Sequence, residues 1–419
     1  MDTPNLQPVM NKNLLEYIKN VKLYNRPGVH TFAITVRVSK GTFINFFAKV
    51  KFLVGQLSKY NGYYKILNDT QFGNKMIPNK YVKGGEIFNR VYIEHGIGTE
   101  LSYHDDLGFI KLIINPTLVV ASKQPGFSQS TYNYMQIAHD YDTDWRLFSE
   151  ILDDFFERWG IPECRHQESS LRRIDVCMDI DMANLDIAKY IYHLRMVPKN
   201  ALVFKDVNFD PEEASRHLTI YNRNRAFSVY DKVCEQFENY KVIYDGNIMR
   251  LKYHFLNPRS SDFVKNLNDV FHIRCMSFVD LVELVTALAP IIIRSNFDDV
   301  FPSGDFVKES YSVYHLLRNP ARRKSQIEKI IRSNNQFRGI DTYEDIERKC
   351  KEMISENTVM YHRMRHMKEA YNIAPLWLEE DEERNFVLPS LPHLIDYVAS
   401  KDKWTSNRIE SLWNFPDFL

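Results

Sequence analysis

The residues of this sequence best suited to chemistry are aspartates that share one face of an expected strand. Residues 171–181 read LRRIDVCMDID, and successive side chains of a strand point to opposite faces of its sheet. Asp175, Asp179 and Asp181 therefore share a face, which Arg173 also joins, and apolar residues occupy the other face. Aspartate is a poor strand former, so this face needs an explanation. Solvent exposure is one explanation. A site for Mg²⁺ or Mn²⁺ on Asp175 and Asp179 is the other, because carboxylate oxygens suit these ions.

A tyrosine on an expected hairpin is the second candidate. Residues 217–232 alternate like two paired strands, with 222–225 as their turn. Tyr230 and Lys232 would share the polar face of the second strand. A phenol has a pKa of about 10 and needs activation as a nucleophile, which a neighbouring cation and a metal-polarised electrophile can supply. Tyrosine is also a common strand residue, and this chain has 24 of them, so a packing role is the alternative.

The surrounding sequence predicts the elements that would position these residues. Alternating, β-branched segments predict strands, and apolar residues at helical spacing predict amphipathic helices. The N-terminal part therefore indicates an α+β fold, an antiparallel sheet with flanking helices, and the pattern becomes all-helical after about residue 260. The expected strands are 30–40, 90–97, 108–116, 171–181, 201–206, the hairpin 217–232 and 248–255, and the expected helices are 13–21, 44–60, 143–160 and 185–194.

Three regions follow from these patterns. Residues 1–29 are expected to be a polar lead-in, and residues 30–258 the α+β domain. Residues 259–419 are expected to form a helical region that binds DNA or another partner. The boundary is placed where the pattern changes to helices that are interrupted by proline residues.

Composition indicates an ordered protein whose net charge is close to zero. The 419 residues contain 54 Lys and Arg against 54 Asp and Glu, so a nucleic-acid partner must be met by a local patch. Five cysteines stand singly, which argues against a zinc ribbon or a disulfide framework and favours a reducing compartment. The first residues lack a signal-peptide pattern, and the most apolar segment is too short to span a bilayer. We therefore expect a cytoplasmic protein with no membrane partner.

A basic run at residues 316–338 could supply such a patch. As a DNA contact it would neutralise phosphates and make affinity depend on salt. As a solvated helix face it needs no partner, and both interpretations stay open. The cations expected to bind DNA are Arg318, Arg322, Arg323, Lys324, Lys329 and Arg332.

The order of these elements resembles that of the rolling-circle replication initiators of small Gram-positive plasmids, the Rep_trans family, and of related phage replication initiation factors. In that family a strand of the form R-[IL]-D-x-x-x-D follows a long amphipathic helix, and residues 173–179 match it. A hairpin then delivers a strand of the form x-[IV]-Y-[ND]-K, which residues 228–232 match, with Glu235 soon after. The resemblance covers roughly residues 85–257.

This resemblance implies a fold related to the HUH endonucleases, with carboxylates in place of the usual histidine pair. It implies site-specific nicking and rejoining of origin DNA, with Tyr230 as the nucleophile and a tyrosine–5′-phosphate intermediate. Asp175 and Asp179 would hold the Mg²⁺ or Mn²⁺, and Lys232 and Arg173 would hold phosphate oxygens. The implied partners are origin DNA, single-stranded or as an extruded hairpin, and a host helicase and polymerase. A homodimer stays open.

One position departs from the family pattern. A strand of the form R-x-E usually follows the tyrosine hairpin, and here Lys252 stands where the glutamate would fall. A charged lysine cannot bind a metal, but it could contact phosphate. Either Glu94, His95 or Asp181 then completes the metal site, or the centre is altered or inactive.

Other functions stay open on the sequence. A relaxase of a mobile element would use the same chemistry. A non-catalytic origin-binding protein with a degenerate active site is a rival of a different class, because only an enzyme would form a covalent adduct with DNA. A structural protein with no DNA role predicts no salt-sensitive DNA binding.

Overall fold

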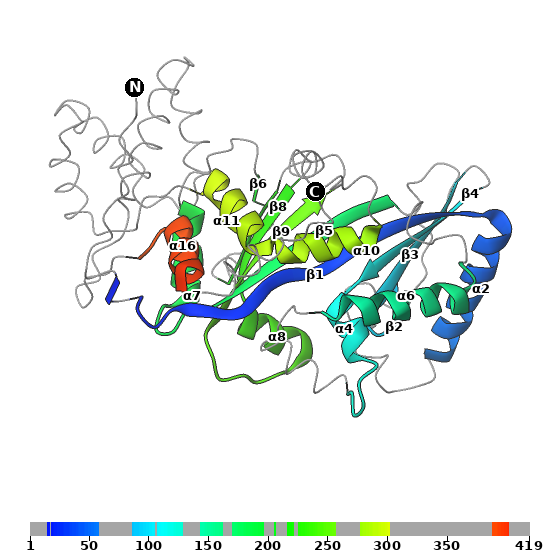
Figure 1. Cartoon of the computed structure of the whole chain (residues 1–419), viewed down its shortest axis with the longest axis horizontal. Helices are drawn as coiled ribbons and strands as arrows, with labels where there is room; N and C mark the ends of the chain where they lie inside the picture. Colours follow the sequence, from blue (N-terminus) through cyan, green and yellow to red (C-terminus); the bar gives the residue numbers. More distant parts are fainter. Residues whose placement is uncertain are drawn as a thin grey trace, which may run out of the picture.

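A single nine-stranded sheet organises the protein (Figure 1). The strand order is β2-β3-β4-β1-β5-β9-β8-β7-β6, and every pair of neighbours is antiparallel. The predicted α+β class with an antiparallel sheet and flanking helices is therefore confirmed. The structure is a computed structural model, and it describes residues 15–16, 18–57, 86–104, 107–128, 143–161, 170–196, 205–206, 216–221, 225–256, 277–301 and 388–401.

The described strands and helices are interspersed up to β9, after which only helices follow. No helix of the described residues is both long enough and apolar enough to cross a membrane. The strands are β1 (Lys22–Ser39), β2 (Glu86–Glu94), β3 (Ile97–His104), β4 (Leu107–Ile114), β5 (Ser170–Asp181), β6 (Lys205–Asp206), β7 (His217–Tyr221), β8 (Arg225–Asp231) and β9 (Ile248–Leu256). The described helices are α2 (Lys40–Leu57), α4 (Pro116–Ala121), α6 (Trp145–Trp159), α7 (Ile187–Met196), α8 (Lys232–Tyr240), α10 (Phe278–Ala287), α11 (Ala289–Val300) and α16 (Leu391–Lys401).

The long strand β1 joins the two halves of the sheet. It pairs with β4 on one side and with β5 on the other. The sequence predicted this strand from residue 30, but it begins at Lys22, so residues 22–29 belong to the sheet and not to a lead-in. Four register shifts against β5 let so long a strand follow the twist of its neighbour, and they fall between Leu23 and Asn25, Asn25 and Gly28, Val29 and Thr31, and Ala33 and Ile34.

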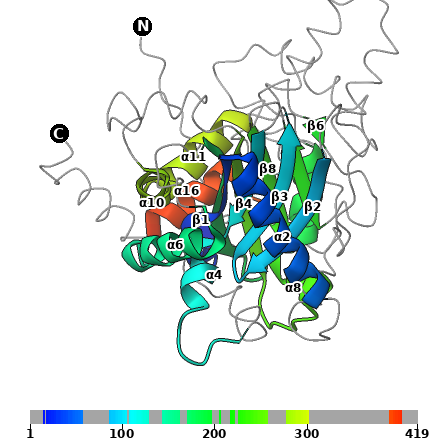
Figure 2. The same cartoon turned by 90° about the vertical axis from the view of Figure 1, so that its right-hand side faces the viewer.

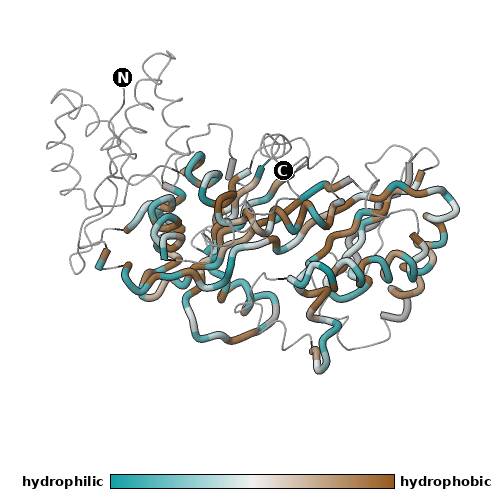
Figure 3. Tube along the Cα trace, viewed as in Figure 1, coloured by the Kyte–Doolittle hydropathy of each residue, from teal (hydrophilic) through white to brown (hydrophobic). Residues whose placement is uncertain are grey.

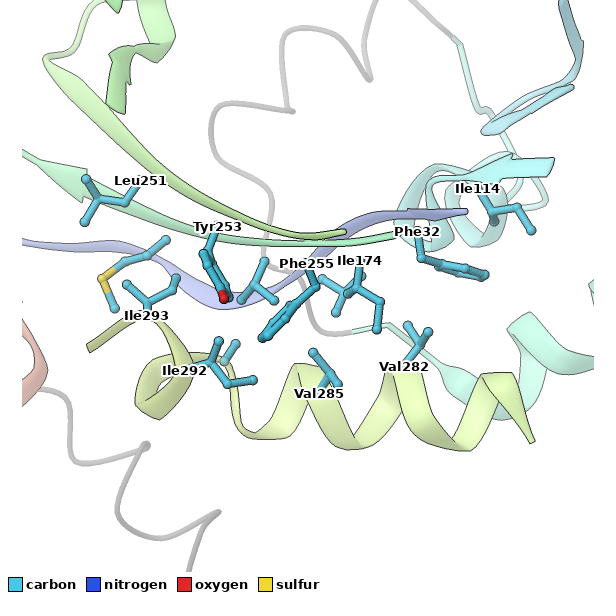
Figure 4. Close-up of a cluster of buried hydrophobic side chains, with 14 of the residues drawn as sticks. Phe32, Ile114, Ile174, Leu251, Tyr253, Phe255, Val282, Val285, Ile292 and Ile293 are labelled. Carbon is cyan, nitrogen blue, oxygen red and sulfur yellow. The ribbon is translucent and has the colours of Figure 1, made fainter. Parts of the chain in front are cut away.

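The apolar face of β1, β5, β8 and β9 is covered by α10 and α11. Figure 4 shows side chains from the strands, among them Ile174 and Phe255, pointing toward Val285 and Ile292 on these helices. Alternation along each strand makes this possible, since every second residue is apolar and buried. In Figure 3 the hydrophobic colour accordingly follows the central strands and α10.

The other helices on this side extend the same core. Figure 2 shows α6 and α16 on the side of the sheet that carries α10 and α11. Phe32 of β1 makes ring contacts with both Phe148 of α6 and Phe278 of α10. The buried cluster is continuous from the strands through α10, α11 and α16. The expected boundary at residue 258 therefore does not divide the hydrophobic core of the described residues.

Local signals explain why α6 begins and ends where it does. The Asp144 carboxylate accepts the Leu147 N–H at 3.0 Å and so satisfies an otherwise unpaired donor of the first turn. Gly160 ends the helix in the left-handed conformation, with φ 73°. The sequence predicted a helix over 143–160, so its end is confirmed and its start was placed two residues early. This helix packs its apolar side on the sheet through Phe148, Leu152 and Phe155.

We expect Phe297→Ala to lower the free energy of unfolding by about 3–5 kcal/mol. Phe297 of α11 is fully buried and lies edge-on to Phe227 of β8, with ring centroids 5.1 Å apart, so its loss leaves a cavity under the sheet. Urea unfolding followed by fluorescence and circular dichroism measures the change. Ile291→Ala on the exposed side of α11 is the control, with a change of about 0.5 kcal/mol or less. Two separate transitions in the wild type would show that α11 does not share the core of the sheet.

Candidate active site

The opposite face of the sheet carries rows of polar side chains across five strands. The register places Asn25 of β1 opposite Asp179 of β5, and Asp179 opposite Arg250 of β9. Arg250 is in turn opposite Tyr230 of β8, which faces His217 of β7. The acidic strand and the tyrosine hairpin, distant in sequence, are therefore separated only by β9.

A second row is formed at Asp175, four residues before Asp179 on β5. Here Thr31 of β1 is opposite Asp175, and Asp175 is opposite His254 of β9. Between the two rows, Cys177 and Lys252 are paired in the same way. Each strand thus presents alternate residues to this face, as the pattern of residues 171–181 predicted.

Asp179 forms a buried ion pair with Arg250. The Arg250 Nε and Nη2 atoms donate to the two carboxylate oxygens of Asp179 at 2.6 and 2.7 Å. The Asn25 side-chain amide donates a third hydrogen bond at 2.9 Å. The side chains of Asp179 and Arg250 are 0% and 1% exposed. A bidentate pair with a third donor offsets the cost of removing these charges from water.

Asp175 is surrounded by a different set of donors. Arg173 donates from Nε and Nη2 at 2.5 and 2.8 Å, and Thr31 donates from its hydroxyl at 2.7 Å. The Nδ1 atom of His254 lies 2.7 Å and Nζ of Lys252 3.1 Å from this carboxylate. Burial raises the pKa of Asp175, but Lys252, His254 and Arg173 outweigh it and hold that pKa well below its usual range. Asp175 is therefore ionised.

The two aspartates do not form one metal site, which corrects the expectation of a shared ion. They stand four residues apart on a strand, so their Cα atoms are about 13 Å apart. Their hydrogen-bonding partners are also separate. Among the described residues, no group of three or more His, Cys, Asp or Glu side chains is placed to hold an ion. Side-chain cations already occupy both carboxylates, so these residues as arranged do not fit Mg²⁺ or Mn²⁺.

Tyr230 lies on the polar face as predicted, in a partly buried position. Its ring lies against that of His217, with centroids 5.5 Å apart. Burial raises the pKa of Tyr230 well above its usual range, although Arg250 acts in the opposite direction. Tyr230 therefore carries its proton at neutral pH. Any nucleophilic role requires a base that takes this proton during attack.

The hairpin pattern predicted that Lys232 continues the second strand. In the structure Lys232 is instead the first residue of helix α8. Asp231 ends β8 and caps this helix by accepting the N–H groups of Val233 and Cys234, both at 2.9 Å. Lys232 is buried and forms an ion pair with Glu235 at 2.5 Å. Burial lowers the pKa of Lys232 to about 8, with Arg250 adding to the effect. The charges of Arg250 and Asp179 both act on Lys232, the first lowering and the second raising its pKa.

A chain of hydroxyl and imidazole groups connects the far strands to Asp175. His217 Nε2 lies 2.5 Å from the Thr219 hydroxyl, which lies 2.8 Å from the Ser228 hydroxyl. Ser228 lies 3.3 Å from Nε2 of His254, whose Nδ1 donates to Asp175. Burial lowers the pKa of His254 and of His217, so both rings are neutral at pH 7.

The three residues expected to complete a metal site contact other partners. Glu94 is at the end of β2, four strands from β5 or about 19 Å, and binds Arg158 at 2.7 and 3.1 Å. His95 packs edge-on against Phe127. Asp181 accepts an N–H of the turn after β5 at 3.0 Å and lies 3.7 Å from Lys22. Each of these side chains therefore has its own local partners, and Glu94 is too far from β5 to share an ion with its aspartates.

The predicted DNA-binding cations fall outside the described residues. They belong to the run 316–338, between the described segments 277–301 and 388–401. Their role stays a prediction. The set is Arg318, Arg322, Arg323, Lys324, Lys329 and Arg332.

Sequence reasoning missed several residues that the structure brings to this face. Arg250 and His254 alternate with apolar residues along β9, so the same period-two argument applied to residues 248–255 could have found them. No such signal marked Asn25 and Thr31, because two of the register shifts between β1 and β5 lie between these residues.

Comparisons with known proteins leave the family open. No protein-family model and no curated protein matches this chain. One similar solved structure is a rolling circle replication initiator protein from Geobacillus stearothermophilus, with 12% identity over 67% of this chain and 85% of that chain and a TM-score of 0.31. Another is DynU16, a protein of the dynemicin biosynthetic locus, with 12% identity over 62% of this chain and 99% of that chain and a TM-score of 0.17. Both scores are too low to bear on fold or function.

We expect Arg250→Met to destabilise the protein by about 3–5 kcal/mol, because it leaves the buried Asp179 carboxylate without its cation. The double variant Asp179→Leu/Arg250→Met removes both charges and should recover most of the loss. Urea unfolding of the four proteins of this cycle measures the coupling. Arg146→Met, which removes a partner from the exposed pair with Glu150, is the control and should change little. Additive effects of the two buried substitutions would contradict the ion pair.

Glu235 should make stability depend on acidic pH. Burial raises the pKa of Glu235, but its ion pair with Lys232 outweighs burial and lowers that pKa to about 2. A lowered pKa in the folded state adds stability above the unfolded value of about 4.3 that is lost as pH falls toward 2. In denaturant titrations from pH 5 to 2, Glu235→Gln should therefore show a shallower loss of stability than the wild type. Parallel curves would contradict this ion pair.

Proposed function

We propose that this protein initiates replication by nicking and rejoining a DNA strand through Tyr230. One observation carries the proposal: Asp179, Arg250 and Tyr230 lie side by side on three neighbouring strands, at the end of the hairpin that delivers the tyrosine. A nucleophile and buried charged groups on one rigid sheet can be held in the geometry that strand transfer requires.

The proposed step is an exchange of phosphodiester bonds. The Tyr230 oxygen attacks the phosphorus atom, and the bond from phosphorus to the 3′-oxygen breaks. The 5′-phosphate stays on the tyrosine, and the leaving 3′-oxygen takes a proton and becomes a free hydroxyl. Because Tyr230 is protonated at rest, a base must accept the phenol proton, and the neutral imidazole of His217 lies against its ring. The reverse exchange rejoins the strand.

Charge on this face favours an anionic ligand. Five side-chain cations lie among four carboxylates, because Arg173 and Lys252 share Asp175, while Asp179, Asp181 and Glu235 each have one cation partner. Fixed cations in a partly dehydrated site stabilise the negative charge that develops on phosphate oxygens. On this proposal the partners are origin DNA, single-stranded or as an extruded hairpin, and a host helicase and polymerase. The basic run 316–338 would add phosphate contacts.

A non-catalytic origin-binding protein is the second candidate. It is favoured by the high pKa of Tyr230 and by carboxylates that are already paired with cations. Such a protein would bind DNA with a strong salt dependence but would form no covalent bond to it. A relaxase would form the same adduct as a replication initiator, so only the DNA sequence that is cut separates those two.

We expect the wild type, incubated with labelled single-stranded origin DNA, to form a protein–DNA adduct that survives denaturing electrophoresis. Tyr230→Phe should form none, because it lacks the attacking oxygen, and mass spectrometry should find the oligonucleotide on the peptide that contains Tyr230. Tyr221→Phe is the matched control, since Tyr221 is an exposed tyrosine of the same hairpin. An adduct in Tyr230→Phe would exclude this nucleophile. Salt-sensitive binding without any adduct would support the second candidate.

A further inference from the structure

We infer that Lys252 and Arg173 take the place beside Asp175 that a divalent cation would otherwise fill, so that this centre holds a DNA phosphate with side-chain cations alone. The inference deepens the proposed function and depends on it only for the identity of the phosphate ligand. The sequence predicted a Mg²⁺ or Mn²⁺ ion bound to Asp175. The arrangement of the residues around Asp175 does not accommodate such an ion.

The first argument is that the carboxylate of Asp175 has no free acceptor position. A carboxylate offers about four lone-pair sites. Five donor contacts already surround Asp175, two of them from Arg173 and one each from Thr31, His254 and Lys252, all between 2.5 and 3.1 Å. A Mg²⁺ ion must approach an oxygen to about 2.0–2.1 Å. It could do so only by displacing at least one of these donors.

The second argument is charge. An ion bound to Asp175 would lie next to the ammonium of Lys252 and the guanidinium of Arg173, both within 3.1 Å of the same carboxylate. Like charges at such distances repel strongly where water is largely excluded. The single negative charge of Asp175 is already shared by two cations, so no negative charge is left for a divalent ion.

The third argument is the difference in solvent exposure between the carboxylate of Asp175 and the two cations beside it. The Asp175 side chain is 1% exposed, whereas the side chains of Arg173 and Lys252 are 40% and 15% exposed. A ligand that reaches this face therefore meets two cations before it meets the carboxylate. Two donors that are partly exposed and anchored from beneath are suited to the oxygens of a phosphate group. The carboxylate acts as the anchor that positions them.

The first test measures Mn²⁺ binding to the full chain directly, by electron paramagnetic resonance of the free ion. We expect the wild type to bind no stoichiometric Mn²⁺ at this site. Lys252→Glu removes a cation and adds a carboxylate beside Asp175 and His254, and it should gain one Mn²⁺ site. Lys123→Glu, at an exposed position on the turn after α4, makes the same change of charge and should gain none.

Two outcomes would overturn the inference. One is stoichiometric Mn²⁺ binding by the wild type that disappears in Asp175→Asn. The other is a Lys252→Glu protein that keeps the wild-type circular dichroism spectrum but gains no Mn²⁺ site. The first outcome does not depend on Lys252→Glu, so the inference can fail even if that variant does not fold.

The second test measures binding of single-stranded DNA with and without EDTA. The affinity of the wild type should be unchanged by EDTA. Lys252→Gln should bind more weakly, and its dependence on salt should fall by about one phosphate contact. A loss of wild-type binding in EDTA would overturn the inference. If both tests succeed but no condition yields an adduct at Tyr230, the nicking proposal fails and the inference stands, so the two failures are distinguishable.

Discussion

The ion pair between Asp179 and Arg250 is the interaction on which the rest of this face depends. Both side chains are essentially inaccessible to solvent, and together they connect β5 to β9 at the point where β9 meets Tyr230. Removing two charges from water is costly, and only a bidentate geometry with further donors offsets that cost. The Asn25 amide supplies such a donor, which is why the early start of β1 matters. The position of the tyrosine hairpin is therefore linked to a charge pair that cannot shift without leaving an unpaired ion.

This face is unusual because buried positions of a sheet are more often apolar, and here several carry charged side chains. The other face of the same strands is apolar and buries a continuous core under α10 and α11. On the polar face each buried charge instead has a partner, and the neutral imidazoles and hydroxyls between them are hydrogen-bonded to one another. Apolar side chains of similar size would stabilise a fold equally well or better. The retention of paired charges is thus more readily explained by binding or chemistry than by stability.

The same pairing shapes what the site can do. A carboxylate surrounded by cations cannot serve as a metal ligand, but it can orient those cations toward a phosphate. A partly buried, protonated phenol beside a neutral imidazole can attack only when its proton leaves in the same event. The proposed nicking and the alternative of DNA binding alone would therefore use the same charged groups. They would differ in whether the phenol proton has a path to a base.

The sequence by itself determined most of the strands and the polar face that carries Arg173, Asp175 and Tyr230, because alternation along a strand is a local property. It did not predict β3 or the first residues of β1. It also determined the hairpin and the end of α6 at Gly160, which local turn and cap preferences specify. Only the tertiary structure decided which polar residues meet. The register of β9 brought Arg250, Lys252 and His254 to the aspartates, and the sheet order left Glu94 four strands away. Pairing between strands distant in sequence depends on the whole core. No local pattern could therefore show that side chains of Arg and Lys would contact these carboxylates.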